Sequence, residues 1–307
     1  MKFLLFPILL FSSITAFAQN TEYVYRNPKD SSYNCYLKVW PDKKLKGIII
    51  RDYSRLPDTA RKSPYQFLKL AMDNGFMVLY SNTTNYFPEL YYDDKGPELL
   101  DEMLYEVFQK HKIPIENIFI GGISASGTRA LRFTQFCNQG KSKYGYKIKG
   151  VFAVDSPIDN ERFYRSAQEN GRKFKGGLKE EAKMMLQRFP EKLGGSPDDF
   201  RANYIQSSVY CQSDSLGGNI IHFKDQSILL FHEPDIDWWV LERGANYNDC
   251  NSYDLAGFTR DLIYLGNTDI ELVSSTGKGF KGSERNCHSW SIVDEVYLMN
   301  WVLERVD

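Results

Sequence analysis

The stretch from Phe119 to Ala130, FIGGISASGTRA, places a serine at a sharp turn between an apolar strand and a helix. Gly121 and Gly122 allow a tight turn before Ser124, because neither carries a Cβ. The residues two before and two after this serine, Gly122 and Ser126, are both small, as an elbow that brings them into contact requires. A serine held in this way can act as a nucleophile if a base takes its proton and an acid orients the base. The alternative is a packed strand-to-helix turn without chemistry.

Gly122-Ile-Ser124-Ala-Ser126-Gly127 resembles the nucleophile elbow of α/β-hydrolases, G-x-S-x-G, with the second glycine displaced by one position. The resemblance implies an α/β-hydrolase fold, a serine hydrolase that needs no cofactor, and a triad in the chain order Ser, acid, His. By the order of its elements it extends from about Lys46 to the C-terminus. In a second assignment Ser126 is the nucleophile, with Ser124 and Thr128 as its small neighbours.

The base is expected among the four histidines of the chain. These are His111, His222, His232 and His288. Only His288 lies in a polar loop between the last predicted strand and the terminal helix. In α/β-hydrolases the catalytic histidine occupies this loop, so the resemblance implies that His288 is the base. A surface histidine is the alternative.

The acid is expected after the predicted strand 227–232, where the chain reads HEPDIDWW. Asp235 follows that strand by three residues and Asp237 by five. Pro234 fixes the turn before Asp235, which favours Asp235. Asp155, at the end of the preceding strand, is a third candidate, because the site resembles that of some lipases. Each aspartate could instead cap a helix.

The oxyanion formed during acyl transfer needs backbone donors. The resemblance implies that the N–H of Ala125 is one donor and that the loop after residues 48–50 supplies the other, near Asp52, Tyr53 or Ser54. This loop reads RDYSRLP and lacks the His-Gly-Gly run of many relatives. Backbone donors need no particular side chain, so activity remains compatible with this departure.

The same loop also suggests a polar floor for the pocket. Arg51 and Asp52 are adjacent and predict a local ion pair. Trp238 and Trp239 follow the candidate acids, and we expect them to pack beneath or beside the site. Trp238 is therefore a candidate for substrate binding.

Buried apolar strands alternate with amphipathic helices along most of the chain. This alternation predicts an α/β fold with a mostly parallel, doubly wound sheet and helices on both faces. Residues 35–40 predict an antiparallel edge strand. The predicted parallel strands are 46–51, 76–80, 118–120, 147–154, 227–232 and 270–274, and the predicted helices begin near residues 63, 97, 125, 253 and 292.

Residues 157 to about 224 interrupt the alternation. This segment is much longer than one crossover helix and contains an amphipathic helix at 179–188. A long insertion at the ligand end of a sheet is often a cap or lid, which is the interpretation we favour over a remote helical decoration. The stretch 194–208 resembles the region before the seventh strand of prolyl-oligopeptidase-like peptidases and related esterases.

The composition excludes some partners and indicates a compartment. The chain has 307 residues, 42% of them hydrophobic, and a net charge of −1, with no basic stripe for nucleic acid or an anionic membrane. Residues 1–18 have the features of a secretory signal, with Lys2, an apolar core at 3–10 and Ala16-Phe17-Ala18 as the cleavage site. Cleavage after Ala18 predicts a periplasmic or extracellular protein in which no segment spans a membrane.

Five cysteines follow the predicted cleavage site. They are Cys35, Cys137, Cys211, Cys250 and Cys287. Because the number is odd, at least one is free or pairs outside the chain. No C-x-x-C motif and no His/Cys cluster suggests a metal site.

Together these features predict one hydrolase domain over residues 19–307, a secreted serine hydrolase that cleaves carboxylic esters through an acyl-enzyme. Its substrate would be a small molecule, a glycan ester or a peptide. A serine peptidase is the first alternative. A non-catalytic binding module on the same fold is the second.

Overall fold

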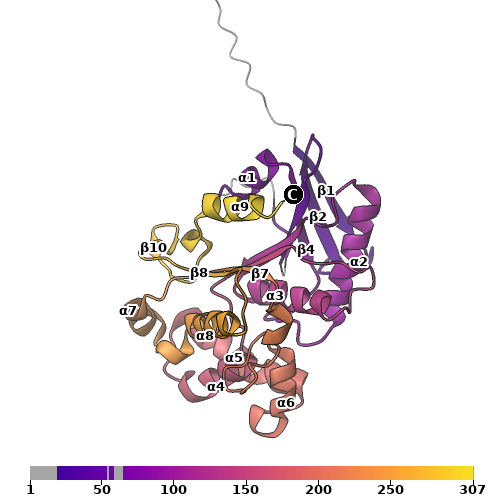
Figure 1. Cartoon of the computed structure of the whole chain (residues 1–307). Coiled ribbons are helices and arrows are strands. Elements are labelled where there is room, and N and C mark those ends of the chain that lie inside the picture. The colour runs from indigo at the N-terminus through magenta and orange to yellow at the C-terminus, as the bar shows by residue number, and fades with distance from the viewer. Residues whose placement is uncertain (1–18, 54, 59–64, 307) are drawn as a thin grey trace, which may run out of the picture.

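The computed structural model describes residues 19–53, 55–58 and 65–306. The predicted secretory signal at 1–18 and the candidate donor Ser54 lie outside these ranges. Figure 1 shows a central sheet with helices against both of its faces.

One sheet of eight strands forms the centre of the molecule, in the order β1-β2-β4-β3-β5-β6-β7-β8. The pairs β1–β2 and β2–β4 are antiparallel, and the remaining pairs are parallel. The strands are β1 (Gln19–Tyr25), β2 (Cys35–Pro41), β3 (Gly47–Asp52), β4 (Phe76–Asn82), β5 (Ile118–Ile123), β6 (Gly150–Val154), β7 (Ser227–His232) and β8 (Ile270–Ser274). The predicted mostly parallel sheet with its antiparallel edge is confirmed. A separate hairpin pairs β9 (Phe280–Lys281) with β10 (Glu284–Arg285).

Helices cover the two faces of the sheet and bury alternate strand residues. On one face α2 (Lys95–Lys110), α3 (Ala125–Asn138) and α8 (Asn251–Tyr264) share a core with Ile48 and Ile50. On the other face α1 (Phe67–Asp73) and α9 (Glu295–Leu303) share a core with Ile49. Since Ile48, Ile49 and Ile50 are all fully buried, the apolar run of β3 is explained by helices on both sides. The helix start predicted near residue 63 lies outside the described residues.

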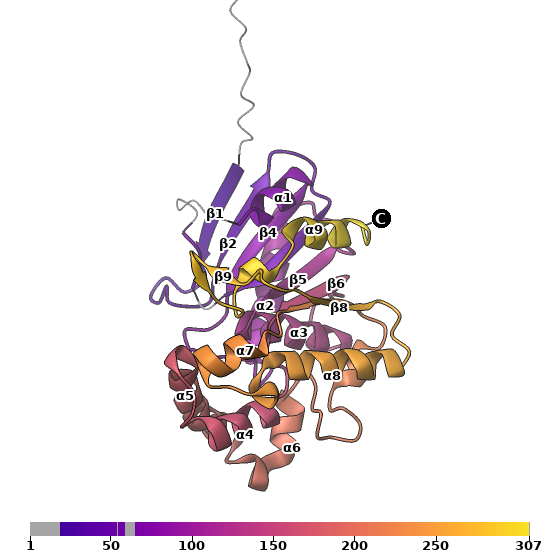
Figure 2. The ribbon, with the colours of Figure 1, turned by 90° about the vertical axis from the view of Figure 1, so that its left-hand side faces the viewer.

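The insertion between β6 and β7 folds into helices rather than a loop. It contains α4 (Asn160–Asn170), α5 (Gly176–Leu193), α6 (Pro197–Ser207) and the 3-10 turn η1 (Ile220–Phe223). Figures 1 and 2 both place α4, α5 and α6 at the end of the molecule opposite α1 and α9. An aromatic core unites these helices, because Phe189 of α5 lies 6.0 Å from Phe163 and 5.9 Å from Tyr204, centroid to centroid.

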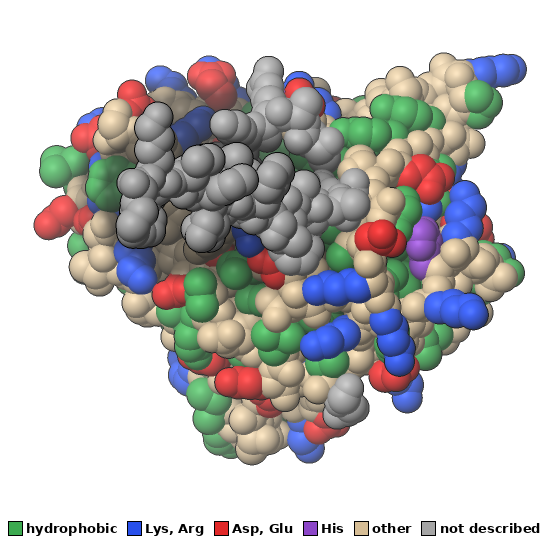
Figure 3. Space-filling view, turned by 90° about the horizontal axis from the view of Figure 1, so that it is seen from above, with side chains coloured by type: hydrophobic (Ala, Val, Ile, Leu, Met, Phe, Trp, Pro, Cys, Tyr) green, Lys and Arg blue, Asp and Glu red, His purple; other side chains and the backbone are tan. Residues whose placement is uncertain are grey.

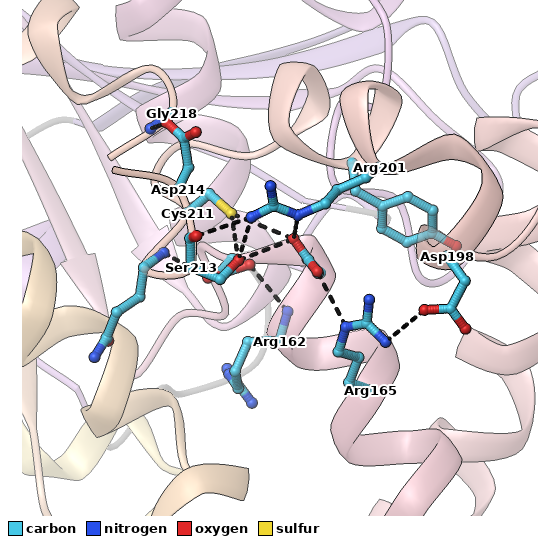
Figure 4. A network of polar contacts seen from close by, with 12 residues as sticks. Arg162, Arg165, Asp198, Arg201, Cys211, Ser213, Asp214 and Gly218 are labelled. Carbon is cyan, nitrogen blue, oxygen red and sulfur yellow. Dashed lines mark hydrogen bonds and ion pairs between the residues drawn. The ribbon is translucent and has the colours of Figure 1, made fainter. Parts of the chain in front are cut away.

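An ionic network around the buried carboxylate of Glu161 ties α4 to α6 and to the loop that follows (Figure 4). The carboxylate of Glu161 accepts hydrogen bonds of 3.0 Å from Arg165, Arg201 and Ser213. Arg165 also pairs with Asp198 at 2.9 Å. The insertion is therefore held by its own apolar core and by a shared carboxylate.

The surface carries both signs of charge. Figure 3 shows basic and acidic side chains interspersed on the face seen there, in keeping with the net charge of −1. Within the described ranges, no helix has the length and apolar character needed to cross a membrane.

Candidate active site

Ser124 occupies a strained elbow between β5 and α3. Its φ of 55° and ψ of −135° lie in a region that non-glycine residues rarely adopt. A Cβ on Gly122 would lie 2.6 Å from the Cβ of Ser126, and a Cβ on Gly127 would lie 2.8 Å from the carbonyl oxygen of Gly122. Both glycines are therefore required by close approach within the turn. The backbone N–H of Ser124 donates to Val154 at 2.9 Å, which fixes the elbow to β6.

Ser126 fills the position at which the motif usually has glycine. Its hydroxyl donates to the carbonyl oxygen of Asp52, and the residue is buried. Ser124, in contrast, lines a cavity of about 270 Å³ that His288 also lines. The arrangement favours Ser124 over Ser126 as the candidate nucleophile.

His288 is oriented by a buried aspartate. Its Nδ1 lies 2.6 Å from Oδ2 of Asp155, a side chain that is 2% exposed. Burial lowers the pKa of His288, but the charge and hydrogen bond of Asp155 and the charge of Glu181 outweigh it, so the pKa is raised above 6.5. Because Asp155 accepts from Nδ1–H, Nε2 is left as the nitrogen that can take a proton.

Asp155 follows β6 directly and has a φ of 41°. In the sheet β6 pairs with β5, with Val154 opposite Ile123. The two strained residues, Ser124 and Asp155, therefore follow neighbouring parallel strands at the same sheet edge.

Among the described residues, neither Asp235 nor Asp237 forms a hydrogen bond or an ion pair with the imidazole of His288. Asp235 caps α7 (Ile236–Trp238), accepting from the N–H of Trp238 at 3.1 Å, and pairs with Arg285 at 2.8 Å. These two contacts, the Trp238 N–H first, lower the pKa of Asp235. Asp237 is exposed. Of the three acids that the sequence offered, the one in contact with His288 is Asp155, although Pro234 had favoured Asp235.

The candidate oxyanion donors are only partly free. No described group accepts a hydrogen bond from the N–H of Ala125, as expected at the first turn of α3. The N–H of Tyr53 donates to Ser81 at 2.8 Å and so extends the β3–β4 ladder. Ala125 is thus positioned as a donor, whereas the N–H of Tyr53 is already used.

The polar floor is built differently from the predicted Arg51–Asp52 pair. Asp52 is fully buried and pairs with Arg129 of α3 at 2.8 Å. The hydroxyl of Tyr91 also donates to Asp52, at 2.6 Å. Arg51 donates to the hydroxyl of Tyr53 at 2.7 Å and lies 3.9 Å from the centroid of the Trp290 ring. The predicted ion pair between Arg51 and Asp52 is therefore wrong. Asp52 pairs instead with Arg129, 77 residues further along the chain.

The tryptophan pair lies beside the site as expected. Trp239, in the π-helical turn η2 (Trp239–Arg243), lines the cavity, and its ring centroid is 6.4 Å from that of His288. Trp238 packs behind it, 5.0 Å between centroids, and its Nε1–H donates to the carbonyl oxygen of Arg285 at 3.1 Å. The cavity residue of the pair is Trp239 rather than Trp238.

The insertion supplies one wall of the cavity. Phe163 of α4 and four residues of α5, Gly177, Leu178, Glu181 and Met184, line it together with Arg243 of η2. The remaining lining residues besides Ser124, His288 and Trp239 are Phe87, Pro157, Asp249, Asn251 and Asn286. The side chains from α4 and α5 are apolar except for Glu181, and η2 adds the basic Arg243.

One cluster has the donor atoms of a metal site. Glu233, Asp235 and Cys287 place ligand atoms within 4.8 Å of one another. The guanidinium of Arg285 pairs with both carboxylates, and burial raises the pKa of Cys287 to about 12. The cation of Arg285 therefore already pairs with the two carboxylates of this cluster. All five cysteines are free thiols.

Comparisons with solved structures agree with this architecture. Esterase B from Lactobacillus rhamnosis matches with a TM-score of 0.62 and 11% identity, over 94% of this chain and 87% of that one. Carboxyl esterase 2 from Tuber melanosporum matches with a TM-score of 0.56 and 13% identity, over 96% and 87%. The acylaminoacyl peptidase of Pyrococcus horikoshii matches with a TM-score of 0.56 and 12% identity, over 100% of this chain and 44% of that one.

By sequence, no protein-family model and no curated protein matches the chain. At identities of 11–13%, the structural likeness concerns the fold alone. The chain has the α/β-hydrolase fold.

Proposed function

We propose that the protein is a serine hydrolase that cleaves carboxylic esters through an acyl-enzyme. The observation that carries this proposal is the arrangement at the sheet edge: Ser124 on a strained elbow, in a cavity shared with His288, whose Nδ1 is held by Asp155. The choice of ester over amide follows by analogy of fold from two of the three solved structures named above, which are esterases, whereas the third is a peptidase.

The proposed reaction uses three side chains and one backbone N–H of the chain. Nε2 of His288 takes the proton of Ser124 as Oγ attacks the ester carbonyl, and Asp155 stabilises the resulting imidazolium. The N–H of Ala125 donates to the oxyanion. His288 then returns the proton to the leaving alcohol, and a water, activated by the same imidazole, releases the acid and restores Ser124.

We further propose that the helical insertion acts as a cap and that the mature protein is secreted. The cap is supported by Phe163, Leu178 and Met184, which line the cavity from α4 and α5. Secretion is supported by the signal-like residues 1–18, and cleavage after Ala18 leaves β1 intact, because that strand begins at Gln19.

Hydrolysis of p-nitrophenyl acetate by wild type, Ser124→Ala and Ser126→Ala tests the proposal. We expect turnover by wild type, loss of at least about 10³-fold in Ser124→Ala, and retained turnover in Ser126→Ala. Turnover retained in Ser124→Ala would refute the assignment. Absence of turnover in wild type with esters of several chain lengths, and with matched anilides, would favour the non-catalytic alternative.

A further inference from the structure

The cavity lined by Ser124 and His288 contains a carboxylate that forms no hydrogen bond or ion pair with any described residue. Glu181, on α5, is half-buried and lines the same cavity. The other acid that lines this cavity, Asp249, accepts a hydrogen bond from Ser166 at 2.6 Å. Asp155, which lies behind His288 and is 2% exposed, holds the imidazole.

The nearby guanidinium does not serve as the partner of Glu181. Arg243 and Glu181 form no ion pair within 4.0 Å, and the guanidinium carbon of Arg243 lies 4.9 Å from the centroid of the Trp238 ring. Cation–π contact is a satisfactory setting for a guanidinium. The guanidinium of Arg243 thus has a cation–π partner within the protein, whereas the carboxylate of Glu181 has no hydrogen bond or ion pair with a described residue.

The surroundings of Glu181 make its isolation costly. Leu178, Met184 and Phe163 line the same wall, and a carboxylate without a partner loses solvation there. Burial, and to a smaller extent the charge of Asp155, raise the pKa of Glu181, against the opposing effect of His288. A positive group delivered by a ligand would relieve this cost.

We propose that Glu181 binds a positively charged ammonium group of the substrate. The site then selects an ester that carries a cation on an apolar body, with the reacting carbonyl at Ser124. The ring of Trp239, which also lines the cavity, offers a face for the same cation. The hydrolytic part of this inference rests on the proposed function, but cation binding at Glu181 does not.

Binding is tested without catalysis. Choline and its uncharged isostere dimethylbutanol, in which carbon replaces nitrogen, are titrated calorimetrically into Ser124→Ala protein that carries Glu181→Gln, Glu180→Gln or neither change. Glu180 is the matched control, because it is the preceding residue, is exposed and pairs with Lys183. We expect Glu181→Gln to weaken choline binding about tenfold and Glu180→Gln to leave it unchanged, with dimethylbutanol affected equally by both.

Equal effects of the two substitutions on choline, or no preference for choline over its isostere, would overturn the inference. Thermal melting of each variant shows whether it is folded, and Glu181→Ala provides a second test if Glu181→Gln is unstable.

Turnover separates this inference from the proposed function. The p-nitrophenyl esters of trimethylammoniobutyric acid and of its carbon isostere dimethylhexanoic acid are compared as substrates of protein in which Ser124 is intact. We expect kcat/KM to favour the cationic ester and Glu181→Gln to remove that preference. Choline binding that depends on Glu181 without turnover of either ester would refute the hydrolase and leave the cation site. Turnover of both esters without a charge preference would refute the cation site in the hydrolase.

Discussion

Nδ1 of His288 lies 2.6 Å from Oδ2 of Asp155, although 133 residues separate them in the chain. The contact arises because Asp155 ends a strand beside that of Ser124, while the loop after β10 brings His288 to the same edge. This contact fixes the tautomer of the imidazole and, against the effect of burial, helps to raise its pKa. The first two predictions depend on it.

Replacing Asp155 with Asn should lower kcat for a simple ester by about 10³–10⁴-fold, because an amide no longer stabilises the imidazolium and can hold the wrong tautomer. Asp235→Asn is the matched control, since Asp235 caps α7 and pairs with Arg285 instead. It should keep kcat within about threefold of wild type. Steady-state kinetics measure both changes in kcat. A larger loss in Asp235→Asn than in Asp155→Asn would identify Asp235 as the acid that orients His288.

The acid limb of the kcat/KM profile should have its midpoint above pH 6.5. His288 must be neutral to act as a base, and its pKa is raised above that value by Asp155 and Glu181 against the effect of burial. Activity should therefore be full above this pKa and fall as pH drops through it. In Asp155→Asn the residual activity should have a limb at lower pH, because burial then dominates. A limb that stays in place would show that Asp155 does not set the pKa of His288.

The sequence predicted what local spacing and strand alternation determine. The sheet could be predicted from runs of apolar residues such as 48–50, which are buried. The elbow could be predicted from glycines at positions where a Cβ would clash with neighbouring atoms. The preference for Asp235 came from a local feature, Pro234, while the contact of Asp155 with His288 depends on which strands are neighbours. In the same way, Arg51 stood beside Asp52 in the chain, but the buried partner of Asp52 is Arg129.

Replacing Arg129 with Met should destabilise the protein by about 3–5 kcal/mol, since it leaves the buried carboxylate of Asp52 without its cation. Lys141→Met is the control. Its partner Asp94 and Lys141 itself are solvent-accessible, so the loss should be below about 1 kcal/mol. Urea unfolding measures both changes in the free energy of unfolding. Losses of similar size would show that the buried Asp52–Arg129 pair contributes no more to stability than an exposed ion pair does.

The helical insertion should lose stability in acid through Glu161. Burial raises the pKa of Glu161, but the hydrogen bonds from Arg165 and Ser213 and the charge of Arg201 outweigh it, so the pKa is lowered below 4.5. A carboxyl group whose pKa is lower in the folded state stabilises that state at pH values above its unfolded-state pKa. This contribution is lost as the pH falls through the folded-state pKa. Glu161→Gln should therefore be less stable at neutral pH and flatter in its acid dependence.

Glu169→Gln, an exposed change on the same helix, is the control for Glu161. Limited proteolysis of the insertion between neutral pH and about pH 3 follows the effect locally. Identical cleavage profiles in the two variants would contradict the role given to Glu161.

The most direct test of the proposed active site is the location of covalent labelling by a fluorophosphonate probe. Wild-type protein should be modified at Ser124, as shown by mass spectrometry of the peptide that spans Ser124 and Ser126. Labelling should be lost in Ser124→Ala and strongly slowed in His288→Ala, while both variants keep the melting behaviour of folded protein. Labelling at Ser126, or undiminished labelling in His288→Ala, would contradict the triad.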